Sequence, residues 1–124
     1  MSGIEYLIDS NIIIYHLNGE EIATRFILEN IEKSAISRIT YIEVLSFPFE
    51  DDKIFRSVKN FLGLFTIIDT NEHIALKSIY NRRIKKIKLP DNIIAATAQI
   101  NNLTLVTRNV KDFNNLEIKI LNIF

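Results

Sequence analysis

The chain has 124 residues, 48% of them hydrophobic, and its 15 basic side chains balance 15 acidic ones. This length suits one domain with its own core, and this hydrophobic content excludes a disordered chain. The absence of cysteine excludes disulfides, cysteine-bound zinc and a thiol nucleophile, and a cytoplasmic protein is the simplest expectation. No basic leader and no run of roughly 18 apolar residues occurs, so we expect neither a signal peptide nor a membrane partner.

Short apolar runs alternate with amphipathic segments along the chain. The strands are expected at residues 5–8, 34–39, 65–68, 103–107 and 118–121. The helices are expected directly after the first strand and at residues 20–33, 40–47, 51–61, 71–86 and 89–100. This alternation predicts an α/β fold, in which one domain over residues 1–124 has a mostly parallel central sheet flanked by helices.

Capping residues and aromatic residues refine this outline. Thr40 is expected to cap the helix that carries Glu43, and Pro48 to interrupt it near Phe47. The larger aromatic side chains are all assigned to the core rather than to base stacking. They include Phe26, Phe47, Phe55, Phe61 and Phe65.

Acidic and amide side chains follow the ends of the expected strands. Asp9 ends the first strand, Glu43 lies in the helix after the second, and Asp91 lies at the start of a helix. Asn109 and Asp112 come just after the fourth strand. In an open α/β sheet, ligands bind beyond the carboxyl ends of the strands. We therefore expect these side chains to gather at one edge of the sheet.

Each acid also has a purely structural interpretation. Asp9 and Asp91 are suited to cap helices, which is the commoner use of an aspartate before a helix. Glu43 would suit a solvent-facing helix position, although its neighbours are apolar, and Asp112 would suit an exposed turn. Taken singly, each acid favours the structural interpretation, whereas their common placement favours a cluster.

A basic segment without any acid precedes Asp91. Its members are Lys77, Arg82, Arg83, Lys85, Lys86 and Lys88. A solvated helix face is the usual meaning of such a run, and a patch that contacts phosphates is the functional alternative. The net charge of zero does not favour a general nucleic-acid binder, so the segment alone leaves both open.

Four blocks of sequence, in this order, resemble the PIN-domain family, and most of all its VapC-type toxins from toxin–antitoxin pairs. The blocks are Tyr-Leu-Ile-Asp-Ser-Asn at 6–11, Ser-Arg-Ile-Thr-Tyr-Ile-Glu-Val-Leu-Ser-Phe-Pro at 37–48, Leu-Pro-Asp-Asn-Ile-Ile-Ala-Ala-Thr-Ala at 89–98 and Leu-Val-Thr-Arg-Asn-Val-Lys-Asp-Phe at 105–113. The resemblance covers essentially the whole chain. It implies an endoribonuclease that uses Mg²⁺ or Mn²⁺, a homodimer, and a cognate antitoxin whose tail enters the active-site groove.

The resemblance also assigns residues. Asp9, Glu43 and Asp91 match the three family acids, and Asp112 is our choice for a fourth. The supporting residues expected around them are Ser10, Asn11, Thr107 and Asn109. The expected RNA contacts are Arg82, Arg83, Lys85, Lys86 and Arg108, although Arg108 is equally suited to orient an acid. Phosphodiester hydrolysis needs an activated water and charge neutralisation at phosphate, and hard cations on carboxylate oxygens supply both.

Two other classes of protein remain as alternatives. A receiver-like phosphoacceptor domain is also a small α/β domain with acids at strand ends, and Asp69 would be its acceptor. That interpretation leaves Glu43 and Asp91 without a role. A non-catalytic relative that binds RNA or protein is the other alternative, and the three intact acids argue against it.

Overall fold

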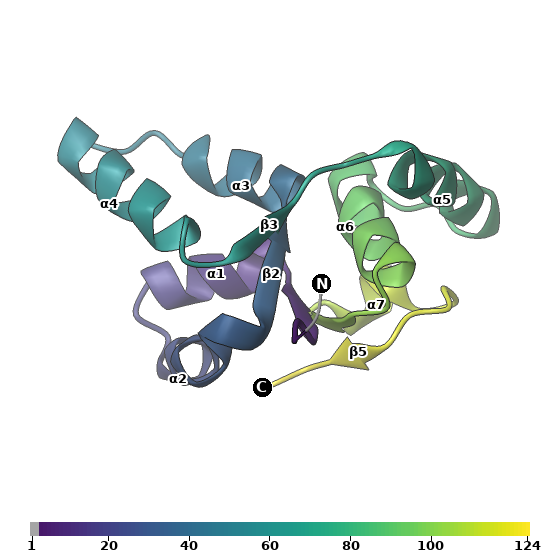
Figure 1. Ribbon diagram of the computed structural model, residues 1–124, viewed down its shortest axis with the longest axis horizontal. Coiled ribbons are helices and arrows are strands. Elements are labelled where there is room, and N and C mark those ends of the chain that lie inside the picture. Colours follow the sequence, from purple (N-terminus) through teal and green to yellow (C-terminus); the bar gives the residue numbers. More distant parts are fainter. Residues whose placement is uncertain (1–2) are drawn as a thin grey trace.

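A computed structural model describes residues 3–124, which form a five-stranded sheet with helices on both faces (Figure 1). The strands are β1 (Tyr6–Ile8), β2 (Ser34–Ser37), β3 (Thr66–Ile68), β4 (Thr104–Val106) and β5 (Ile120–Leu121). Their order in the sheet is β3-β2-β1-β4-β5, and every neighbouring pair is parallel. The predicted α/β fold with a mostly parallel sheet is confirmed.

The helices fill the connections between these strands. They are α1 (Ser10–Leu17), α2 (Glu21–Asn30), the short 3-10 helix η1 (Ile31–Lys33), α3 (Arg38–Leu45), α4 (Asp52–Leu62), α5 (Glu72–Ile84), α6 (Leu89–Ile100) and α7 (Val110–Phe113). The sequence did not predict α7, whose four residues are too few to show a helical period. Among the described residues, no helix is both long and apolar enough to cross a membrane.

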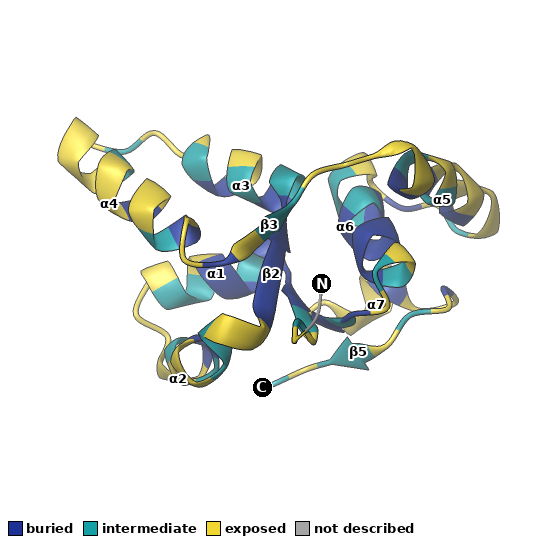
Figure 2. Cartoon of the chain, in the orientation of Figure 1, coloured by how far each residue is buried: buried dark blue, intermediate teal, exposed yellow. Residues whose placement is uncertain are grey.

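The central strands alternate their side chains between two separate cores. Ile8, Ile36 and Val106 are fully buried on the face covered by α1, α2 and α4. Their neighbours Leu7 and Leu105 are fully buried on the opposite face, together with residues of α6 and α7. Figure 2 shows this burial along the central strands. A parallel sheet covered on both faces requires such continuous apolar strands.

The strand order places a crevice beside β1. The chain runs from β1 outward through β2 to β3, and then returns to form β4 on the other side of β1. The connections on the two sides of β1 therefore diverge at the carboxyl ends of β1 and β4. This is the topological switch point at which open α/β sheets bind their ligands.

Two local expectations were wrong. Thr40 does not cap α3, because β2 ends earlier and Ser37 takes the cap position, where its hydroxyl accepts a hydrogen bond from the Ile39 amide at 3.2 Å. Thr40 is instead fully buried inside the helix. Phe47 is not in the core but 65% exposed, because α3 ends at Leu45 and the chain turns outward before Pro48.

Candidate active site

Asp9 lies directly after β1 and is only 4% exposed. Its backbone amide continues the sheet by donating to the Val106 carbonyl at 3.0 Å. Its Oδ2 accepts a hydrogen bond from Thr107 Oγ1 at 2.7 Å. Asp9 occupies the N-cap position of α1, but its side chain makes no capping hydrogen bond. The carboxylate is therefore held against β4 rather than used to start the helix.

Glu43 comes to the same edge from the middle of α3. Ser10, the first residue of α1, donates a hydrogen bond from Oγ to Glu43 Oε1 at 2.7 Å. Ser10 Oγ also lies 2.9 Å from Thr40 Oγ1. The Ser10 side chain thus orients Glu43, whereas its backbone amide is the part that contacts Asp9. The buried Thr40 serves this contact, which explains a threonine inside a helix.

Asp91 is the third residue of α6, after Lys88 in the N-cap position, so it does not cap the helix. Burial raises the pKa of Asp91, and the nearby carboxylates of Asp112 and Glu43 raise it further. Asp112, on α7, lines the same cavity as Asp91. Asn109, by contrast, contacts Thr107 through its backbone amide, which donates a hydrogen bond to Thr107 Oγ1 at 3.0 Å.

The electrostatics join these acids into one group. Burial raises the pKa of Asp9 to about 6; the hydrogen bond from Thr107 opposes this rise, and the charges of Asp91 and Glu43 add to it. Asp91 in turn feels Asp112 and Glu43. Carboxylates from four segments thus repel one another at the switch point, as the sequence predicted for this edge.

The donor set fits a hard divalent cation, because it consists of carboxylate and amide oxygens. Within residues 3–124, no three acidic or histidine side chains lie close enough together to coordinate one ion by themselves. Mg²⁺ does not require this, since it keeps several waters and binds through one or two carboxylates. Asn11, two residues after Asp9, has a buried amide group whose two polar atoms have no hydrogen-bond partner among the described residues.

The basic segment divides into two parts. Lys85 Nζ donates to the backbone carbonyls of Lys111, at 2.6 Å, and Asn114, and also contacts the Asn114 side chain. It therefore ties the end of α7 to the end of α5. Lys86 is exposed and, with Lys88, lines a cavity of about 200 Å³ that also contains both Asp91 and Asp112. Arg82 and Arg83 are exposed on the last turn of α5.

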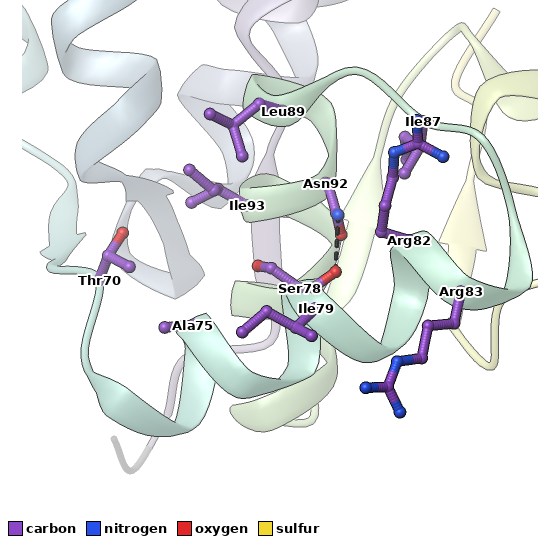
Figure 3. A pocket seen from close by; sticks show the side chains of 10 residues that line it. All are labelled: Thr70, Ala75, Ser78, Ile79, Arg82, Arg83, Ile87, Leu89, Asn92 and Ile93. Atoms are coloured by element: carbon purple, nitrogen blue, oxygen red, sulfur yellow. Dashed lines mark hydrogen bonds between the residues drawn. The ribbon is translucent and has the colours of Figure 1, made fainter.

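A buried polar network beside Asp91 was not predicted from the sequence. Asn92 Nδ2 donates to the Ser78 carbonyl at 2.8 Å, the bond drawn in Figure 3, and its Oδ1 accepts from Asn81 Nδ2 at 3.1 Å. Asn81 also donates to Gln99 Oε1 at 2.8 Å. This network fixes α6 against α5 next to Asp91. Polar residues on the apolar face of α6 were the available signal.

Asp69, the acceptor in the receiver alternative, has a different environment. It follows β3 and binds Arg38, whose Nε donates to Asp69 Oδ1 at 2.6 Å. That hydrogen bond lowers the pKa of Asp69. The flavodoxin-like order of receivers is 2-1-3-4-5, which also differs from the order found here.

Comparison with known proteins decides the family. The model of the PIN domain matches residues 6–119. The chain belongs to the PIN domain family. The receiver alternative is therefore wrong. Among curated proteins, none matches the chain.

Solved structures agree with this family. A chain of a toxin–antitoxin complex from Klebsiella pneumoniae is 34% identical, with a TM-score of 0.86, and the match covers 97% of this chain and 98% of that one. FitAcB from Neisseria gonorrhoeae is 25% identical with a TM-score of 0.82, over 95% and 97% of the two chains. DNA-bound VapBC from Salmonella typhimurium shares the fold at 20% identity and a TM-score of 0.85, over 98% and 99%.

These matches confirm the resemblance to VapC-type PIN toxins. VapC-type PIN toxins are nucleases, and PIN nucleases generally use divalent metal ions. The structure brings Asp9, Glu43 and Asp91 to the carboxyl-end edge of the sheet, where open α/β sheets bind ligands, and Asp112 lines one cavity with Asp91.

Proposed function

We propose that this chain is a cytoplasmic, metal-dependent endoribonuclease and the toxin of a type II toxin–antitoxin pair. One PIN domain over residues 1–124 would carry the whole activity. The observation that supports this most is the group of mutually repelling carboxylates at the switch point, whose charges add to the burial that raises the pKa of Asp9 to about 6. Mg²⁺ or Mn²⁺ is the cofactor whose charge and oxygen preference match this group.

The residues have distinct parts in this proposal. Asp9, Glu43 and Asp91 would hold the cation, directly or through its bound waters, with Asp112 as the fourth acid. A bound cation supplies an activated water and neutralises charge on the scissile phosphate. Thr107 and Ser10 would keep two of the carboxylates oriented, through the hydrogen bonds that they donate. Asn11 and Asn109 are proposed as supporting residues.

The substrate is proposed to be RNA that crosses the basic side of this edge. Arg82, Arg83 and Lys86 are exposed and free to reach phosphates, whereas Lys85 is already engaged with α7. The segment leads into Asp91, so a strand bound along it would arrive at the acids. Phosphate contacts of this kind position a nucleic acid without reading its sequence.

The direct test is cleavage of single-stranded RNA by the purified chain, with Mg²⁺, with Mn²⁺ and with a chelator. We expect internal cleavage with either ion and none with the chelator. Binding of RNA without cleavage under any ion would favour the non-catalytic alternative instead. Cleavage that persists in the chelator would contradict a cation-dependent reaction.

The proposed antitoxin would occupy an apolar groove next to Glu43. This cavity of about 460 Å³ is lined on one side by Ile14 and Leu17 of α1 and on the other by Phe47 and Ile54. All four side chains are exposed by 40% or more. An exposed apolar groove beside a charged site suits an amphipathic protein segment. Loss of neutralisation in Phe47→Lys, with toxicity retained, would support this placement.

The homodimer implied by the resemblance remains a proposal. A second groove of about 580 Å³ lies between α5 and α6, where Ala75 and Ile79 face Leu89 and Ile93 (Figure 3). Ile79 and Leu89 are 55% and 68% exposed. Sedimentation of the wild type and of Ile79→Glu tests this groove as the contact, with a dimer and a monomer as the expected results.

A further inference from the structure

Arg108, at the carboxyl end of β4, packs against two aromatic rings that also contact each other. Its guanidinium carbon is 4.5 Å from the ring centre of Phe124 and 5.4 Å from that of Tyr15. The two rings lie 5.3 Å apart and are tilted by 59°. The three side chains come from the loop after β4, from α1 and from the segment after β5. They are called the Arg108 clamp below.

The clamp holds a charge without neutralising it. Among residues 3–124, no carboxylate forms an ion pair with Arg108 and no acceptor takes a hydrogen bond from it. Arg38 shows the opposite case: its guanidinium lies 4.9 Å from the Tyr41 ring centre, but Asp69 binds its edge. Arg108 therefore keeps its planar fork of N–H donors for an external partner, and that fork matches the two oxygens of a phosphate.

The backbone around the clamp is fixed to the carboxylate cluster. Thr107, the preceding residue, donates to Asp9, and the following amide donates to Thr107 Oγ1 at 3.0 Å. Tyr15 belongs to the helix that starts directly after Asp9. The Arg108 guanidinium is thus held at a fixed position relative to the acids. A contact that aligns a bound strand with the acids requires such a fixed position.

The clamp is nevertheless set apart from the acids themselves. The charges that act on Asp9 are those of Asp91 and Glu43, and Arg108 is not among them. Tyr15 lies six residues after Asp9, which is about 9 Å along a helix. That distance corresponds to roughly two to three nucleotides of a stacked strand, at about 3.4 Å each. Among residues 3–124, no ion pair joins Arg108 to an acid, so the structure gives no support to a role for Arg108 in orienting one.

We propose that the Arg108 clamp binds the phosphate of a nucleotide that flanks the cleavage point, and so sets the register of the RNA strand across the acids. This rests on the proposed ribonuclease function. The aromatic rings restrict the long arginine side chain before RNA arrives, which reduces the conformational entropy lost on binding. A flanking contact is equally strong in the ground state and in the transition state, so it affects KM and not kcat.

The test compares Arg108→Ala, Phe124→Ala and the matched control Arg38→Ala on one short single-stranded RNA. For Arg108→Ala we expect KM to rise about tenfold with kcat within about twofold, and the log–log salt slope of binding to fall by about 0.7. Phe124→Ala keeps the charge but loosens the clamp, so its KM should rise about threefold. Its cleavage positions should spread over neighbouring bonds. Arg38→Ala should change none of these.

Several outcomes would overturn the clamp. KM and slope unchanged in Arg108→Ala would show that no phosphate binds there. A fall in kcat with KM unchanged would place Arg108 at the reacting phosphate instead. An equal effect in Arg38→Ala would mean that the loss of RNA affinity comes from the change in net charge and not from the clamp. Weaker antitoxin binding with unchanged RNA binding would make the clamp a protein contact.

Binding measured in an Asp9→Asn background separates this proposal from the function on which it rests. RNA affinity that depends on Arg108, together with a wild-type chain that cleaves no RNA with either ion, would contradict the ribonuclease and leave the clamp standing. Normal cleavage without dependence on Arg108 would contradict the clamp alone. A chain that binds no RNA would contradict both.

Discussion

Two aspartates, Asp9 and Asp69, end strands at the same edge of one parallel sheet and have opposite properties. Asp9 follows the central strand β1, is 4% exposed and has its pKa raised to about 6 by burial and by neighbouring acids. Asp69 follows the edge strand β3, its side chain is 70% exposed, and Arg38 lowers its pKa. Position in the sheet, rather than local sequence, makes one aspartate a candidate ligand and the other a surface ion pair.

The largest effect should come from removing the carboxylate charge of Asp9 and measuring RNA cleavage. Asp9→Asn keeps an oxygen that can accept the Thr107 hydrogen bond but removes the charge that attracts a cation. We expect cleavage to fall by more than about a hundredfold, because even partners of metal ligands cost 10–100-fold. Asp69→Asn is the matched control and should cleave at the wild-type rate. Equal losses of cleavage in both variants would contradict the different roles assigned to the two aspartates.

The stability of the metal-free protein should show the next largest effect. The raised pKa of Asp9 means that the folded state keeps a proton which the unfolded state has released, so the penalty grows from about pH 4 to about pH 6 and is complete above it. Asp9→Asn removes this penalty. We expect its free energy of unfolding in urea at pH 7.5 to exceed that of the wild type by up to about 3 kcal/mol.

The pH dependence is the control for that measurement. At pH 4 the wild-type carboxyl is largely protonated, so the gain from Asp9→Asn should disappear. A gain of equal size at pH 4 and pH 7.5 would mean that it has no electrostatic origin. For Asp69 the sign is reversed, because its lowered pKa stabilises the fold above the unfolded pKa and this contribution is lost as the pH falls.

The hydrogen bond from Thr107 offers a finer test. It stabilises the charged form of Asp9, so Thr107→Val should raise the pKa of Asp9 above about 6. We expect the carboxyl carbon of Asp9 to titrate about one pH unit higher by NMR in the metal-free protein. Thr104→Val, on the strand β4 that Thr107 directly follows, is the control. A midpoint that does not move would show that the Thr107 hydrogen bond does not affect the pKa of Asp9.

The smallest effect should come from the pair on the edge strand. Arg38→Ala removes the partner of Asp69 at an exposed position, where ion pairs contribute little to stability. The melting temperature should therefore change by less than about 2 °C, measured by circular dichroism in low salt. A larger fall would mean that the contact of Arg38 with the Tyr41 ring supports α3.

The sequence was sufficient for the fold and for the convergence of the acids, because both follow from chain-order rules. Apolar runs separated by amphipathic segments fix a parallel sheet, and the ends of such strands meet at one edge. Asp91 follows no strand and taken singly suits a helix cap; its common placement with the other acids favoured the cluster, and the family resemblance then matched it to a family acid.

Contacts that depend on exact side-chain directions were beyond the sequence. Nothing in the pattern distinguishes Lys85, which is bound to the end of α7, from Lys86, which is exposed. The bond from Ser10 to Glu43 joins residues 33 positions apart, and only the packing of α1 on α3 creates it. The exposure of Phe47 depends on where α3 stops, and element ends are the least predictable feature of a sequence.

Thermal melts with and without manganese, from pH 5 to pH 8, test most directly whether the acids at the switch point form one cation site. For the wild type and for Asp69→Asn we expect Mn²⁺ at ten times its dissociation constant to raise the melting temperature by about 5 °C at pH 7.5. This rise should shrink toward pH 5, where protons compete for Asp9. Asp9→Asn should respond to the ion little or not at all. A wild type indifferent to Mn²⁺, or an Asp9→Asn variant with the full response, would contradict the site.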